Sequence, residues 1–109
     1  MRVAIAVEAG QVASHFGRCE RYLVADVVDG TIRTPEEVAN PGHQPGVLPA
    51  MLHGLGVECV VAGGMGPRAQ EMFQQYGIAT IVGVTGDPHE ALLKLASGTL
   101  RGGPSLCDH

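Results

Sequence analysis

Residues 57–69 read VECVVAGGMGPRA and place an apolar run, a Gly-rich loop and a proline in direct succession. The run 57–62 is short and rich in valine, which predicts a buried strand. Pro67 is expected as the first residue of a helix, because its missing N–H would have no partner at that position in any case. The helix then carries an apolar stripe made of Ala69, Met72, Phe73 and Tyr76, and Gly77 ends it. The stretch predicts one strand–loop–helix unit.

Two similar apolar runs, 2–7 and 79–84, flank this unit along the chain. We expect all three runs to be neighbouring parallel strands, because right-handed connections through helices join such strands. The connecting helices are predicted over 47–55 and 67–76. A third helix is expected from Asp87, which has Glu90 three positions on and so forms a capping box.

Asp29-Gly30 predicts a hairpin between strands at 22–28 and 31–38, since this dipeptide tolerates the positive φ angles of two-residue turns. The hairpin should add two antiparallel strands beside the first strand. The expected fold is therefore an α/β domain with a mixed five-stranded sheet flanked by about three helices. Ligands of such sheets bind at the carboxyl ends of the strands.

The composition indicates one cytoplasmic domain. The chain has 109 residues, of which 45% are apolar, and its net charge is −4. We expect a folded domain over 1–98 and a Gly-rich, flexible tail over 99–109. The acidic charge and the absence of a basic run argue against nucleic acid as a partner. The N-terminal apolar run is too short for a membrane span, and three cysteines do not predict a disulfide framework.

The loop after the first strand contains SHFGRC at 14–19, which places His15 and Cys19 four residues apart. Imidazole and thiolate are both metal ligands. The plainer interpretation is an exposed histidine and a half-buried cysteine. We expect Cys19 to be exposed enough to react and Cys59, which lies among valines, to be structural.

The loop 63–69 can direct backbone N–H groups at an anion, because it leads into a helix N-terminus. Gly64 and Gly66 would allow close approach of a ligand, and Arg68 places a cation where a helix dipole disfavours one. The plainer alternative is a tight turn with an outward-pointing arginine. Further candidate ligands are His43, Cys107 and His109, each of which is more often a surface residue.

The order of these elements resembles the dinitrogenase iron-molybdenum cofactor biosynthesis family, which includes NifX, NafY and the C-terminal domain of NifB. The resemblance rests on HFGRC at 15–19, GGMGPRA at 63–69 and a closing Cys-x-His, and it covers nearly the whole chain. It implies a ribonuclease H-like fold. It also implies noncatalytic binding of an iron-sulfur or iron-molybdenum cluster in transit between donor and acceptor proteins.

In this interpretation the chain is not an enzyme, and His15 and Cys19 match the motif next to the cluster. Arg18 and Arg68 would offset the charge of an anionic cluster, with His43 nearby. Two alternatives remain open. One is a zinc site made of His15, Cys19, Cys107 and His109, whose spacing is unconventional. The other is a phosphate- or nucleotide-binding module that uses the loop 63–68.

Overall fold

The structure, a computed structural model, describes residues 1–42 and 46–105. Its elements follow in the order β1 (Arg2–Glu8), β2 (Gln11–Val12), a 3₁₀ turn η1 (Phe16–Arg18), β3 (Arg21–Val28), β4 (Thr31–Ala39), α1 (Val47–Gly54), β5 (Cys59–Val61), α2 (Pro67–Tyr76), β6 (Ala79–Ile81) and α3 (Pro88–Ala96). Within the described residues, no helix has the length and apolar character that crossing a membrane requires.

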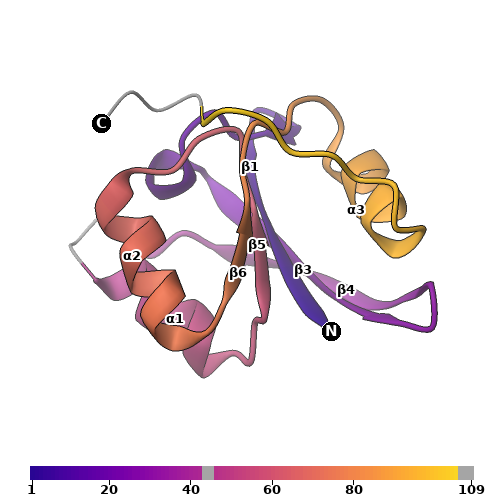
Figure 1. Cartoon of the computed structure of the whole chain (residues 1–109), viewed down its shortest axis with the longest axis horizontal. Coiled ribbons are helices and arrows are strands. Elements are labelled where there is room, and N and C mark those ends of the chain that lie inside the picture. The colour runs from indigo at the N-terminus through magenta and orange to yellow at the C-terminus, as the bar shows by residue number, and fades with distance from the viewer. Residues whose placement is uncertain (43–45, 106–109) are drawn as a thin grey trace.

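The strands form one mixed sheet in the order β4-β3-β1-β5-β6 (Figure 1). As predicted, β1, β5 and β6 are parallel neighbours, and β3 and β4 add antiparallel strands beyond β1. The prediction of five strands missed β2, whose two residues pair with the end of β1. A mixed sheet with three helices is thus confirmed for the described residues, whereas the ribonuclease H-like label stays a prediction.

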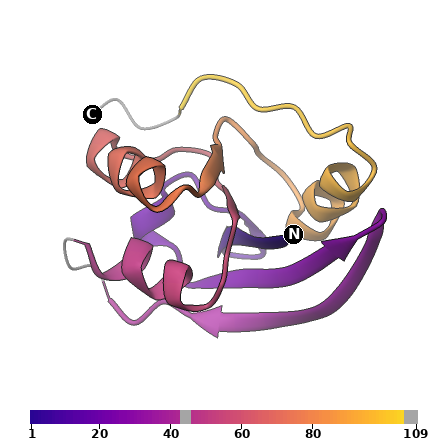
Figure 2. The same ribbon diagram turned by 60° about the horizontal axis from the view of Figure 1, so that its bottom comes forward.

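The helices cover the two faces of the sheet unequally (Figure 2). Alternate residues of β1 divide between the faces: Ala4 and Ala6 pack with residues of α1 and α2, and Val3 and Ile5 pack with residues of α3. This alternation is the period of a strand, so one apolar run supplies both halves of the core.

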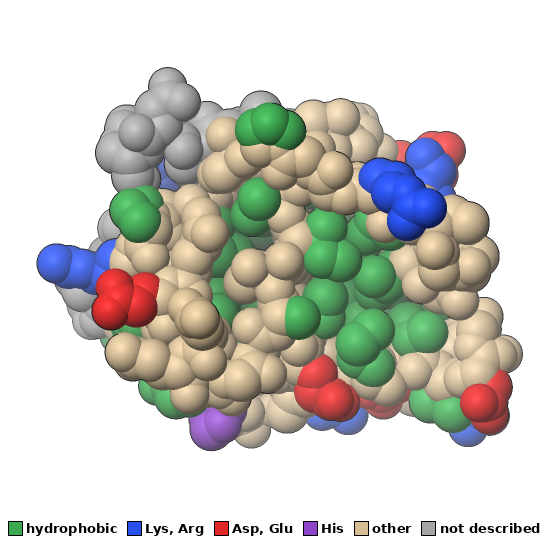
Figure 3. Space-filling view, viewed as in Figure 1, with side chains coloured by type: hydrophobic (Ala, Val, Ile, Leu, Met, Phe, Trp, Pro, Cys, Tyr) green, Lys and Arg blue, Asp and Glu red, His purple; other side chains and the backbone are tan. Residues whose placement is uncertain are grey.

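On the α3 face, apolar side chains remain partly exposed between β6 and α3 (Figure 3). They come from β3, β4, β6, α3 and the segment after it: Val27, Ile32, Ile81, Leu95 and Leu100. One helix packs on this face of the sheet, whereas α1 and α2 pack on the other.

Both cysteines within the described residues are buried. Cys59 in β5 is structural, as expected, and burial raises the pKa of its thiol to about 11. The prediction that Cys19 is accessible is wrong, because only 5% of its surface is exposed. The chain turns inward after η1, and the Asn40 side-chain amide donates to the Cys19 carbonyl over 2.8 Å. Burial raises the pKa of the Cys19 thiol as well.

The core under α1 should be sensitive to the replacement of a large buried side chain by a smaller one. Leu52 is fully buried, whereas Leu93 in α3 is 61% exposed. We expect Leu52→Ala to lower the free energy of unfolding by about 3 kcal/mol, because it leaves a cavity. The matched control Leu93→Ala should change it by less than about 0.5 kcal/mol. Urea titration followed by circular dichroism measures both, and equal losses would contradict this description of the core.

Thiol labelling tests the burial of Cys19. In a Cys107→Ser background, we expect Cys19 and Cys59 to react with a disulfide reagent far more slowly in the native protein than in urea. Asn40→Ala should accelerate labelling of Cys19 about fivefold relative to Cys59, because it removes a hydrogen bond that holds the turn. Mass spectrometry of peptides assigns the sites. Native labelling of Cys19 at the unfolded rate would instead show that the turn opens freely.

Candidate functional site

Three loops at the carboxyl edge of the parallel strands are joined by backbone hydrogen bonds. The Gly63 N–H donates to the Ala13 carbonyl over 2.8 Å, and the Phe16 N–H donates to the Gly64 carbonyl over 2.9 Å. The Gly83 N–H in turn donates to the Gly63 carbonyl over 2.8 Å. The expectation that the loops after the first strand and after the 57–62 strand meet at this edge is therefore confirmed.

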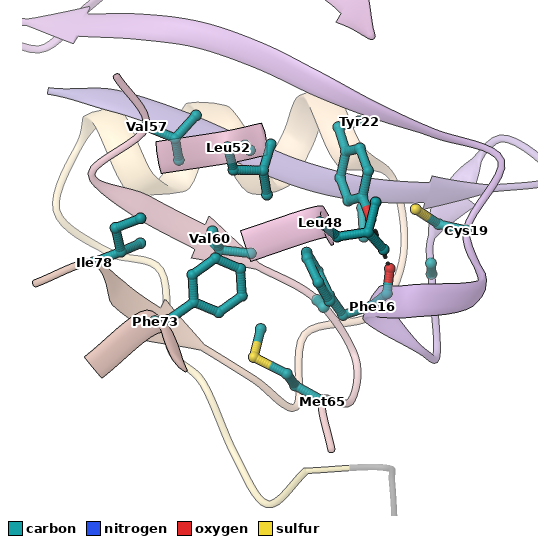
Figure 4. Close-up of a cluster of buried hydrophobic side chains, with 14 of the residues drawn as sticks. Phe16, Cys19, Tyr22, Leu48, Leu52, Val57, Val60, Met65, Phe73 and Ile78 are labelled. Carbon is teal, nitrogen blue, oxygen red and sulfur yellow. Dashed lines mark hydrogen bonds between the residues drawn. The ribbon is translucent and has the colours of Figure 1, made fainter. Parts of the chain in front are cut away.

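Phe16 fixes the first of these loops to the core (Figure 4). Its ring is buried and lies edge-on to Phe73, with 5.2 Å between the ring centroids. The ring of Tyr22 is 5.4 Å away, and the Tyr22 hydroxyl donates to the Phe16 carbonyl over 3.1 Å. Because both the side chain and the carbonyl of Phe16 are held, its neighbours in the sequence have defined positions on the surface.

Asn40, which follows β4, holds the other side of the η1 turn. Its side-chain amide donates to the carbonyls of Cys19 at 2.8 Å and Gly17 at 3.4 Å. No local pattern predicts this role, because Asn40 and Cys19 lie 21 residues apart. Only the pairing of β3 with β4 brings them together.

His15 and Arg18 are both exposed at the edge, on either side of the buried Phe16. They contribute to a shallow hollow of about 190 Å³. The remaining lining comes from the end of β1, from β2 and from the loop after it: Glu8, Gln11, Val12, Ala13 and Ser14. Cys19 does not line this hollow, since its thiol is packed in the core cluster with Phe16 and Tyr22. The structure thus separates the two members of the predicted ligand pair.

The loop into α2 carries the predicted glycines and arginine. Gly64 is buried and bonded to Phe16, while Gly66 forms the N-cap of α2 without a side-chain hydrogen bond. The first turn of α2 contains no acidic residue, and Arg68 in it is exposed. The N-terminus of α2 is therefore electropositive from both its dipole and a side chain.

The segment after α3 also reaches this edge, which the sequence did not predict. The Gly103 N–H donates to the Val82 carbonyl over 2.8 Å, and the Ser105 hydroxyl accepts from the Met65 N–H over 3.0 Å. A signal was present in the pair Gly102-Gly103, because adjacent glycines often mark a close approach of backbone. The predicted flexibility of the whole tail stays a prediction, but residues 103 and 105 contact the domain.

Metal-binding groups do not cluster in the part of the chain that the structure describes. No three His, Cys, Asp or Glu side chains within residues 1–42 and 46–105 are placed to hold a metal ion together. Of the predicted ligands, His43, Cys107 and His109 lie outside the described residues. The zinc site that combines His15 and Cys19 with the last two is therefore untested.

The chain is similar to known proteins along its length. Protein MJ0580 of Methanocaldococcus jannaschii is 29% identical over 83 residues, which cover 72% of this chain and 70% of that protein. The crystal structure of PH0822 matches with a TM-score of 0.90 and 29% identity, over 100% of both chains.

The apo form of the orange protein from Desulfovibrio gigas shares the fold, with a TM-score of 0.78 and 20% identity over 95% of this chain and 93% of that one. The family model described as dinitrogenase iron-molybdenum cofactor matches residues 1–98. Because this match spans most of the chain, the protein belongs to the dinitrogenase iron-molybdenum cofactor family.

Proposed function

We propose that the protein binds an anionic iron-sulfur or iron-molybdenum cluster at the carboxyl edge of its sheet and carries it during metallocofactor assembly. It would receive the cluster from a donor protein and pass it to an acceptor in the cytoplasm, without catalysing a reaction. Membership of a family that serves biosynthesis of the dinitrogenase cofactor supports this proposal. The cluster is cargo, so the site must hold it and also release it.

The bonding of the 13–16 loop to the 63–64 loop is the observation that carries the proposal. It holds His15 and Arg18 at the same edge as the loop that leads into α2. A neutral imidazole can coordinate a metal, while a guanidinium and helix N–H groups attract negative charge. The same edge thus offers a side chain that can coordinate a metal and positive groups that can offset the charge of an anion.

Electrostatics favour reversible binding there. The protein has a net charge of −4, yet Arg18, Arg68 and the N-terminus of α2 are positive features of this edge. Both arginines are exposed, so salt screens their attraction for an anion. A cargo held by one histidine and by screened charges can leave more easily than one held by four thiolates.

His15 would coordinate the cluster, whereas Cys19 belongs to the buried core beneath the loop. The Cys19 thiol is buried and its raised pKa disfavours the thiolate that would bind metal. Coordination by Cys19 would need the η1 turn to open and release the Asn40 contact. Participation of His43, Cys107 and His109 stays a prediction.

Replacement of His15 tests the site directly. We expect His15→Ala to lower retention of extracted iron-molybdenum cofactor at least fivefold, because few protein ligands hold it. The control is His89→Ala, which removes an exposed histidine at the start of α3. Each variant is incubated anaerobically with the cofactor and desalted, and its iron and molybdenum are counted. Equal retention by wild type, His15→Ala and His15→Ala/Cys19→Ala would contradict the site.

Arg68 should act through charge and not through coordination. We expect Arg68→Ala to weaken cofactor binding by about threefold at low salt, and the difference should shrink at 0.5 M salt. Arg33→Ala in β4 removes another exposed arginine, away from this edge, and serves as the control. Titration by absorbance at both salt concentrations measures the effect. If nucleotides raise the melting temperature of the protein and the cofactor does not, the result would support the phosphate-binding alternative.

A further inference from the structure

Residues 99–105, here called the C-terminal strap, lie across the carboxyl edge of the sheet. Figures 1 and 2 show this segment leaving α3 and passing over the ends of the strands toward the loop before α2. The strap therefore connects the two layers of the fold over the edge to which we assign the cluster.

Among the described residues, the contacts of the strap with the domain fall at three places along its length. At its start, the N–H groups of Thr99 and Leu100 donate to the Lys94 carbonyl, and the Leu100 side chain packs against the α3-face core. In its middle, the Gly103 N–H donates to the Val82 carbonyl over 2.8 Å. At its end, the Ser105 hydroxyl accepts from the Met65 N–H at 3.0 Å, and its distance to the Met65 carbonyl is 3.4 Å.

Glycine is required at the middle attachment because the backbones approach closely. A Cβ on Gly102 would lie 2.7 Å from the Val82 carbonyl oxygen, a distance that real Cβ atoms do not show. A Cβ on Gly83 would lie 2.6 Å from the backbone of Gly103. The strap thus fits the domain closely at this crossing.

The strap nevertheless buries little surface. Arg101, Gly102, Gly103 and Pro104 are all exposed, and Leu100 is its one large apolar side chain against the core. A segment with few buried apolar contacts and with exposed backbone opens at a lower free energy than the whole domain unfolds. Its last attachment can therefore break while the domain stays folded.

The Ser105 hydroxyl accepts a hydrogen bond from the backbone N–H of Met65, which lies in the loop that leads into α2. An anion that accepted a hydrogen bond from the Met65 N–H would have to displace the Ser105 hydroxyl from this donor. A ligand and an internal group that compete for one donor cannot both bind, so the ligand selects the open state.

We propose that the C-terminal strap is a gate over the cluster site, closed by Ser105 on Met65 and opened when the anionic cargo enters. This inference rests on the proposed function and adds a regulatory step to it. Only open molecules can bind the cluster, so the apparent affinity for the cluster falls in proportion to the fraction of molecules that are open. Weakening the strap should raise this fraction and make loading faster.

Two substitutions weaken the strap without touching the proposed ligands. Ser105→Ala removes the hydroxyl that holds Met65. Gly102→Ala adds a Cβ that the Val82 carbonyl excludes, and Gly102 has no positive φ that would strain alanine locally. The matched control is Gly54→Ala in α1, where an added Cβ meets nothing within 4 Å.

Two measurements are made on each full-length variant. Hydrogen exchange followed by NMR gives the opening rate at the Met65 amide and at core amides such as Val60. Anaerobic mixing with extracted iron-molybdenum cofactor gives the rate of loading. We expect both strap variants to raise Met65 exchange and cofactor loading together by about fivefold to tenfold, the effect of losing one hydrogen bond. Exchange at Val60 and the behaviour of Gly54→Ala should match the wild type.

The other outcomes are distinguishable. Unchanged Met65 exchange in both strap variants would show that the strap does not hold this amide, and it would overturn the gate. Faster exchange with unchanged or slower loading would also overturn it, while leaving the proposed function intact. If no variant and no wild-type protein takes up cofactor, the proposed function fails and the gate fails with it.

Discussion

The arrangement of the carboxyl edge depends on how Phe16 is held. Its ring packs against Phe73 and Tyr22, its carbonyl accepts from Tyr22, and its N–H donates to Gly64. A side chain of the core therefore sets the position of a surface loop, and that loop is bonded to the loop before α2. The exposed His15 and Arg18 are therefore positioned by the buried residue that lies between them in the sequence.

Much of the fold followed from local patterns. The turn at Asp29-Gly30 has φ angles of 52° and 76°, both positive as such a hairpin needs. Asp87 accepts from the N–H groups of His89 and Glu90 and caps α3, as its sequence context indicated. Parallel pairing of β1 with β5 and β6 followed from three apolar runs joined by helices. In each case the signal lies within a few residues, or in a general rule of topology.

The site was less predictable, because its decisive contacts join residues that are distant in the sequence. The loop position of Cys19 suggested exposure, but Asn40 and the rings of Phe16 and Tyr22 enclose it only after β3 and β4 have paired. Met65 and Ser105 lie 40 residues apart, and no periodicity relates them. Short motifs indicated which residues carry chemistry, whereas the fold decides which of them reach the surface together.

The contact between Gly103 and Val82 lies next to the outer edge of the sheet, which β6 forms. β6 is the outermost strand and pairs with β5 on one side, and no strand among the described residues pairs with its other side. Such edges are where separate chains pair and aggregate. The strap closes the end of this edge with one hydrogen bond, and the glycines that permit the crossing leave no side chain to obstruct another backbone. Opening of the strap would release the Val82 carbonyl, which lies directly after β6, so the strap limits access to backbone groups next to the end of this outermost strand.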